Sequence, residues 1–162
     1  MLIATQEAED FSKTIQEYAD VYWRSKSLSD EDKNIIIKRL IFLSSELNDA
    51  PKFQGLTEGE YKKDGSKRRD VERWVENLVN AAIDISKILL ASQKRAAPST
   101  YREILQFIDF LPGFSGDITK QLSIYAQLRN ILAHEYLDIR CKRIGAFIKD
   151  STVIFSKFFH IK

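Results

Sequence analysis

The chain has 162 residues, of which 44% are hydrophobic and 30% charged, and this length fits one domain with its own core. Six glycines and three prolines exclude a collagen-like or low-complexity chain and disfavour an all-β sandwich, which needs more turn residues. The single cysteine, Cys141, excludes an internal disulfide framework, and two histidines, His134 and His160, leave little for a multi-histidine metal site.

The net charge of +2 is too small to indicate a partner, but the charge is unevenly distributed. Residues 1–34 hold eight acidic and four basic side chains, a net charge of −4, so the remainder carries +6. Two basic groups, within 62–69 and 140–143, can contact phosphates or can simply be solvated turns. The candidate RNA-binding residues in them are Lys67, Arg68, Arg69, Arg140, Lys142 and Arg143.

The N-terminus does not resemble a targeting signal. Residues 1–10 contain three acidic side chains and no basic one, whereas a secretory signal begins with a positive segment. The longest apolar runs, around 35–37 and 40–43, are far too short to span a membrane. We therefore expect a cytoplasmic protein with a reduced cysteine.

Helical spacing of apolar residues dominates the first half of the chain. A stripe at positions 11, 15, 18 and 22 predicts an extra N-terminal helix within 1–34. Ser29 is placed to cap a second helix that runs to about Asn48, and its apolar residues on more than one face predict a central, buried element. Residues 49–66 read as a long loop with at most one helical turn, followed by a long helix over 67–92.

The second half continues the pattern with three further helices. Thr100 and Glu103 form a predicted capping box for a short helix that ends at 111–113. Asp117 is the expected cap of the next helix, and Asp138 the expected start of the last. The aromatic segment 153–159 either joins the core or pairs with another chain. The sum is a single all-α domain, an antiparallel bundle of five to six helices.

One helix carries an unusual set of polar residues. Arg129 occupies a position that the three-and-four spacing assigns to the packed face, and Tyr136 lies seven residues further on, pointing nearly the same way if the helix continues that far. Asn130 and His134, four apart, are neighbours on the adjacent face. A charge on a packed face needs a partner. The spacing alone leaves open that Arg129 pairs with a carboxylate such as Asp84 while His134 caps a helix end.

The residues from Arg129 to Tyr136, an Arg, four residues, His, one residue and Tyr, resemble the signature of the HEPN superfamily, specifically the HepT-like toxins. The order and spacing of the segments 69–74, 82–85, 99–103 and 128–139 are also similar, so the resemblance covers about residues 35–140. The first 34 residues look like an extra helix before the usual start of the family.

The resemblance implies a helical bundle that forms a homodimer and acts as an endoribonuclease on tRNA or mRNA without a metal or any other cofactor. It assigns the catalytic roles to Arg129 and His134 and an orienting role to Asn130. It also implies a cognate MntA-like nucleotidyltransferase antitoxin, which attaches AMP to Tyr136. Chemically the roles are reasonable, because histidine exchanges protons near neutral pH and arginine grips two phosphate oxygens.

Two other functions compete with this interpretation. The chain can be a non-catalytic partner or nucleotide-binding subunit of a minimal nucleotidyltransferase, because a grip on phosphate does not require turnover. Alternatively it is a structural bundle in which the motif forms an interface network.

Four residues outside the motif have simpler expectations. Trp23 and Trp74 are predicted core residues, and His160 a surface or helix-end residue. Basic neighbours can lower the pKa of Cys141, although a passive thiol is the expectation we favour.

Overall fold

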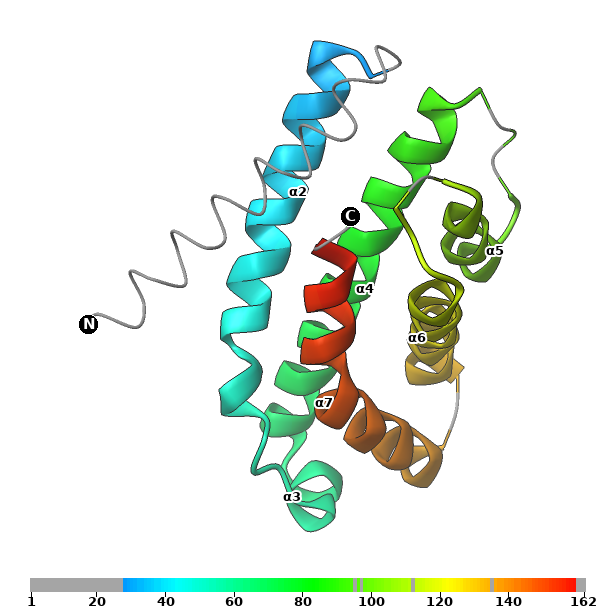
Figure 1. Ribbon diagram of the computed structural model, residues 1–162. Helices are drawn as coiled ribbons and strands as arrows, with labels where there is room; N and C mark the ends of the chain where they lie inside the picture. The colour runs from blue at the N-terminus through cyan, green and yellow to red at the C-terminus, as the bar shows by residue number, and fades with distance from the viewer. Residues whose placement is uncertain (1–27, 95, 97, 112, 135, 160–162) are drawn as a thin grey trace, which may run out of the picture.

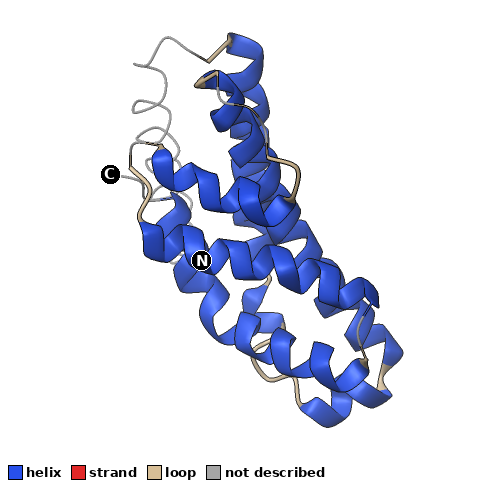
Figure 2. Cartoon of the chain, turned by 90° about the vertical axis from the view of Figure 1, so that its right-hand side faces the viewer, coloured by secondary structure: helices blue, strands red, loops and turns tan. Residues whose placement is uncertain are grey.

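The computed structural model describes residues 28–94, 96, 98–111, 113–134 and 136–159. These ranges contain six α-helices, two short 3-10 helices and no strand, which confirms the predicted all-α bundle (Figures 1 and 2). The elements are α2 (Asp30–Asn48), η1 (Ala50–Lys52), α3 (Glu58–Lys63), α4 (Gly65–Ser92), α5 (Tyr101–Phe107), η2 (Ile108–Phe110), α6 (Gly116–His134) and α7 (Leu137–Phe159). The predicted stripe at 11–22, Trp23 and His160 lie outside the described residues.

Helix α4 is the centre of the bundle. It contacts α2, α3, α5, α6 and α7, with α2 on one side and α5 and α6 on the other (Figure 1). The prediction that the helix over 30–48 is central and well buried is therefore wrong. Helix α2 buries one stripe, Ile36, Leu40 and Leu43, against the core, while Ile41 on its outer face is 52% exposed. Apolar residues on two faces of a helix thus did not mean two packed faces.

The predicted loop over 49–66 is more ordered than its glycines and proline suggested. It contains η1 and the six-residue α3, which begins with a full capping box between Thr57 and Glu60. Asp64 then caps α4 by accepting hydrogen bonds from the backbone amides of Ser66 and Lys67. Helix α4 consequently begins at Gly65, two residues before the predicted boundary.

The helix boundaries in the second half are close to the prediction. The capping box of Thr100 and Glu103 is confirmed at the start of α5. Helix α6 begins at Gly116, so Asp117 lies inside its first turn rather than at the cap, and α7 begins at Leu137, one residue before Asp138. A carboxylate in a first turn still favours the positive end of the helix dipole.

An aromatic cluster joins α4, α6 and α7 in the core. The Phe147 ring lies 5.5 Å from Trp74, 4.6 Å from Tyr125 and 6.2 Å from Phe155, measured between centroids.

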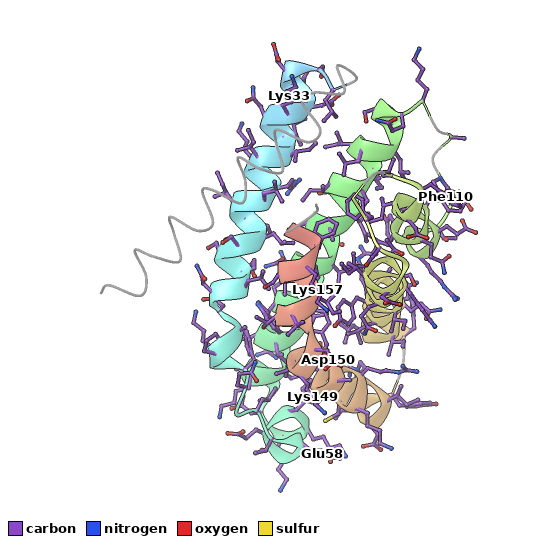
Figure 3. The ribbon with its side chains drawn as sticks, viewed as in Figure 1. Lys33, Glu58, Phe110, Lys149, Asp150 and Lys157 are labelled. Carbon is purple, nitrogen blue, oxygen red and sulfur yellow. The ribbon has the colours of Figure 1, made fainter. Side chains whose placement is uncertain are left out.

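Trp74 is buried as predicted, and its indole nitrogen donates to the Glu46 carbonyl. Figure 3 labels Lys149, Asp150 and Lys157 along α7, the helix that carries Phe147.

The aromatic end of α7 belongs mainly to this core. Phe155 and Phe158 are fully buried, so the alternative that they pair with another chain is wrong. Val153, in contrast, is 56% exposed on the outer side of α7.

Removal of the α5 cap should cost stability. The Thr100 hydroxyl accepts a hydrogen bond from the Glu103 amide at 3.2 Å, and the Glu103 carboxylate accepts one from the Thr100 amide. Thr100→Ala removes the acceptor of the Glu103 amide and leaves this donor to water, and we expect a loss of about 1 kcal/mol in the free energy of unfolding. Urea unfolding followed by circular dichroism measures this loss of stability. The control Thr100→Ser keeps the hydroxyl and should keep most of the stability. An unchanged Thr100→Ala variant would show that the cap is not needed.

Candidate active site

The motif spans the last turns of α6 and the corner that leads to α7. Helix α6 ends at His134, so the expectation that Arg129 and Tyr136 share a helix face is wrong, because the helix does not reach Tyr136. Arg129 is partly buried, whereas Asn130 and His134 are exposed. Tyr136 lies between the two helices with 83% of its surface exposed, and its carbonyl accepts the amides of Ile139 and Arg140 in the first turn of α7.

Arg129 lines an open groove of about 390 Å³ formed by α2, α4, α5 and α6. Its guanidinium carbon lies 4.9 Å from the centroid of the Tyr101 ring, a cation–π contact. Lys87 of α4 places its ammonium nitrogen at the same distance, 4.9 Å, from that ring. Within the described residues, the partner of the motif arginine is thus an aromatic face and not an acid.

Asp84, the carboxylate suggested as an alternative partner of Arg129, is bound to a different arginine. It pairs with Arg39 of α2, with 3.1 Å between the guanidinium nitrogen and the carboxylate oxygen. Within the described part of the chain, no carboxylate lies at ion-pair distance from Arg129, so that alternative is wrong.

Asn130 faces a second groove, of about 420 Å³, between α6 and α7. Arg143 of α7 lines the same groove, so the structure brings these two candidate residues together. Tyr125 lies at its inner wall, where burial raises the pKa of the phenol to about 12. The neighbours Arg129 and Asn130 therefore serve two different grooves on opposite flanks of α6.

The corner that holds His134 and Tyr136 is tied to the bundle by Arg140. Its Nη1 donates to the Glu72 carboxylate at 3.1 Å and to the Leu132 carbonyl, in the last turn of α6, at 3.4 Å. Glu72 also accepts the hydroxyl of Tyr61, so one carboxylate joins α3, α4 and α7. A cation on the last carbonyls of a helix stabilises its negative end. Arg140 thus has a structural partner on both sides of the corner.

The other basic candidates differ in how far they are engaged. Lys67 pairs with Glu60 at 2.6 Å, and Arg68 donates to the backbone carbonyls at positions 61 and 62. Arg69, Lys142 and Arg143 are exposed. Among the described residues, these three have no hydrogen bond or ion pair that an external phosphate would have to replace.

Cys141 is a passive thiol. Burial, with a smaller contribution from the Glu58 carboxylate of α3 (Figure 3), raises the pKa of Cys141 above its usual value. The basic Lys62 does lower the pKa of Cys141, but burial outweighs this effect, so the favoured expectation of a passive thiol agrees with the structure.

Alkylation of Cys141 tests this conclusion directly. Because less thiolate is present at neutral pH, iodoacetamide should react with Cys141 more slowly than with an exposed peptide thiol. Mass spectrometry over time gives the rate, and unfolding the protein in urea should accelerate the reaction. A faster rate in the folded chain would contradict the raised pKa.

The described residues contain no group of three or more His, Cys, Asp or Glu side chains placed to hold a metal ion. Within the same residues, no helix combines the length and apolar character needed to cross a membrane.

The comparison with protein families identifies the chain. The family model described as "Ribonuclease HepT-like" matches residues 8–159. The chain belongs to the HepT-like ribonuclease family. The match begins at residue 8, so it extends beyond residues 35–140, on which the resemblance in the sequence rested. No curated protein matches the chain. Ribonuclease activity is thus the activity of its family. The described residues of this HepT-like chain form an all-α bundle.

Sequence reasoning missed the groove residues around Arg129 of this HepT-like chain. Arg39, Lys87 and Tyr101 come from three helices that are distant in sequence, and none belongs to the motif. The only local signal was the capping box, because Thr100 fixes where α5 begins and hence where Tyr101 stands.

Proposed function

We propose that the chain is the toxin of a toxin–antitoxin pair and cleaves RNA as a metal-independent endoribonuclease, with Arg129 and His134 as catalytic residues. One observation carries this proposal. The motif arginine lines an open groove without a carboxylate partner among the described residues, and the motif histidine is exposed at the end of the same helix. An arginine without an internal anion is available to hold a phosphate.

The helix geometry supports a site shared by two protomers. Arg129 and His134 are five positions apart, which on an α-helix places them roughly 140° apart around the axis and about 7.5 Å apart along it. The two side chains of one protomer therefore do not face the same side. A second copy, related by two-fold symmetry, can offer its histidine to the first copy's arginine. We propose that the active site is such a composite cleft in a homodimer.

The roles follow from the chemistry of RNA cleavage. His134 would remove the proton of the attacking 2′-OH, and the partner's His134 would protonate the leaving oxygen. Arg129 would stabilise the charge that develops on the phosphate, and Asn130 would orient the substrate.

RNA outside the cleavage point would be held by exposed basic residues. Among the described residues, Arg69, Lys142 and Arg143 are the candidates without a competing hydrogen bond or ion pair, and Arg143 shares its groove with Asn130. The other three candidates could bind RNA only if RNA replaced their internal partners; they are Lys67, Arg68 and Arg140.

Tyr136 is the proposed acceptor of AMP from an MntA-like nucleotidyltransferase antitoxin. Its exposure and its place in the break between α6 and α7 make the hydroxyl accessible to a modifying enzyme. An attached AMP would bring an anion and a bulky base close to the motif and block the phosphate site by charge and size.

RNA incubated with the purified chain and EDTA tests the proposal. Cleavage should occur and should stop after treatment with the nucleotidyltransferase and ATP, which should add one AMP by mass. Tyr136→Phe should remain active and unmodified. RNA that stays intact with the untreated chain would contradict the proposal, and an unmodified wild-type chain would remove Tyr136 from it.

A second function is favoured by the same 140° separation. Because Arg129 and His134 of one protomer face different sides, the chain can hold a nucleotide as a non-catalytic partner of the nucleotidyltransferase. Tight binding to that enzyme, together with full stability of RNA, would support this function over the first.

A further inference from the structure

We propose that the Arg129 groove is an RNA backbone subsite, in which Arg39 and Lys87 bind a phosphate next to the scissile one and Tyr101 positions Arg129. This inference rests on the ribonuclease function proposed above and deepens it. The groove is lined by residues of α2, α4, α5 and α6. In the bundle, α4 lies between α2 on one side and α5 and α6 on the other (Figure 1). No residue of this set except Arg129 belongs to the sequence motif.

The charge of the groove favours a polyanion. Three cationic side chains line it, Arg39, Lys87 and Arg129, against one acid, Asp84, whose carboxylate is engaged by Arg39. Lys87 is exposed, and no described carboxylate lies within ion-pair distance of it. A positive groove of this kind concentrates phosphate and would release counterions when RNA binds.

The Tyr101 ring brings the Lys87 ammonium and the Arg129 guanidinium close together, because both groups contact it. Lys87 and Arg129 both lie 4.9 Å from the centroid of Tyr101, which is itself only partly covered. Two like charges on one ring repel each other, and an anion that binds both removes this repulsion. The ring also holds the Arg129 guanidinium in one orientation, so that less conformational entropy is lost when a phosphate binds.

The other residues that line the groove suit the polar backbone of RNA rather than an apolar ligand. The amides of Asn77 and Asn80 contribute to the walls, and the Asn77 amide nitrogen donates to the Glu46 carboxylate at 3.2 Å. The groove also reaches Phe42, 37% exposed on α2, at its rim. A polar, positive groove with an aromatic rim is the combination that single-stranded nucleic acid uses.

Binding of a short fluorescent single-stranded RNA tests the subsite. The His134→Ala chain serves as the host, because it should bind the RNA without cleaving it, and anisotropy is measured over a series of KCl concentrations. Lys87→Gln should weaken binding and make the slope of log K against log salt shallower by about 1. Lys120→Gln, an equal charge change at an exposed position of α6 outside the groove, should leave both quantities unchanged.

Asp84→Asn should change the affinity for RNA in the opposite direction. It removes the only acid among the described residues that line the groove and frees Arg39, so RNA should bind more tightly. The broken ion pair is half exposed, and its loss should cost the fold no more than about 1 kcal/mol. Equal affinities for Lys87→Gln, Asp84→Asn and Lys120→Gln would overturn the subsite.

Tyr101 is tested in the catalytic background that retains His134. Tyr101→Leu should lower kcat more than it raises KM, because the ring orients Arg129 rather than binding RNA, and Tyr101→Phe should restore kcat. A rise in KM alone, or no rescue by phenylalanine, would overturn the positioning role.

Two controls distinguish the RNA subsite from a mononucleotide site and from a failure of the proposed ribonuclease function. AMP should displace the labelled RNA only at far higher concentration than unlabelled RNA does, and equal potency would assign the groove to a mononucleotide and overturn the RNA subsite. If the chain with His134 intact cleaves RNA in EDTA but the groove variants behave like Lys120→Gln, the subsite fails and the ribonuclease function stands. If it cleaves no RNA, the ribonuclease function fails.

Discussion

Replacing His134 with alanine should reduce the rate of RNA cleavage by a factor of about 10²–10⁴, the contribution that a general acid or base makes to catalysis. The imidazole is exposed at the last residue of α6 and has no packing role there, so the fold should be unaffected. Cleavage of a defined RNA in EDTA, with circular dichroism of the same samples, measures both effects.

The second histidine provides a matched control. The chain contains only His134 and His160, and His160→Ala removes the same chemical group outside the motif. We expect His160→Ala to keep full activity. If His134→Ala cleaved RNA as fast as the wild type, His134 would have no part in the mechanism.

Replacing Phe147 with alanine should lower the free energy of unfolding by about 3–5 kcal/mol. The side chain is 1% exposed and sits between the rings of Trp74, Tyr125 and Phe155. Its removal leaves a cavity where α4, α6 and α7 meet, and this cavity cannot close without moving helices. Urea unfolding gives the free energy from the transition midpoint.

Val153→Ala on the same helix is the control. Val153 is 56% exposed, so its truncation should change stability by less than about 0.5 kcal/mol. Similar losses for Phe147→Ala and Val153→Ala would show that the aromatic cluster does not hold α7 on the bundle.

Local patterns predicted the helices well where they carried capping chemistry. The Thr100 and Glu103 box placed α5, and Ser29 placed the start of α2, where its hydroxyl accepts the Asp32 amide. The same pattern at Thr57 and Glu60 was present in the sequence, but the glycines around it directed the interpretation toward a loop. The presence of these helices could therefore be predicted from short-range capping hydrogen bonds.

Which helix lies at the centre could not be read from apolar content. Helices α2 and α4 both carry apolar residues on several faces, but only α4 is surrounded by other helices. Burial depends on what packs against a face, and that information is distributed over the whole chain. The outer face of α2 therefore stayed exposed although the sequence pattern resembled a buried element.

The motif was found from sequence, but its surroundings were not. Spacing identified Arg129 and His134, and the family match over residues 8–159 agrees with that resemblance. Spacing did not show that Arg129 rests on Tyr101 or that Asp84 belongs to Arg39, because those contacts join helices distant in sequence. The helix end at His134 also separated Tyr136 from the face of Arg129.

The central claim is that two protomers share one catalytic cleft, and mixing wild-type chains with an Arg129→Ala/His134→Ala double variant tests it most directly. After exchange of subunits, a shared cleft predicts that cleavage per wild-type chain falls in proportion to the wild-type fraction, because mixed dimers lack one set of groups. Constant cleavage per wild-type chain at every ratio would show that each protomer carries a complete site, and would contradict the composite active site.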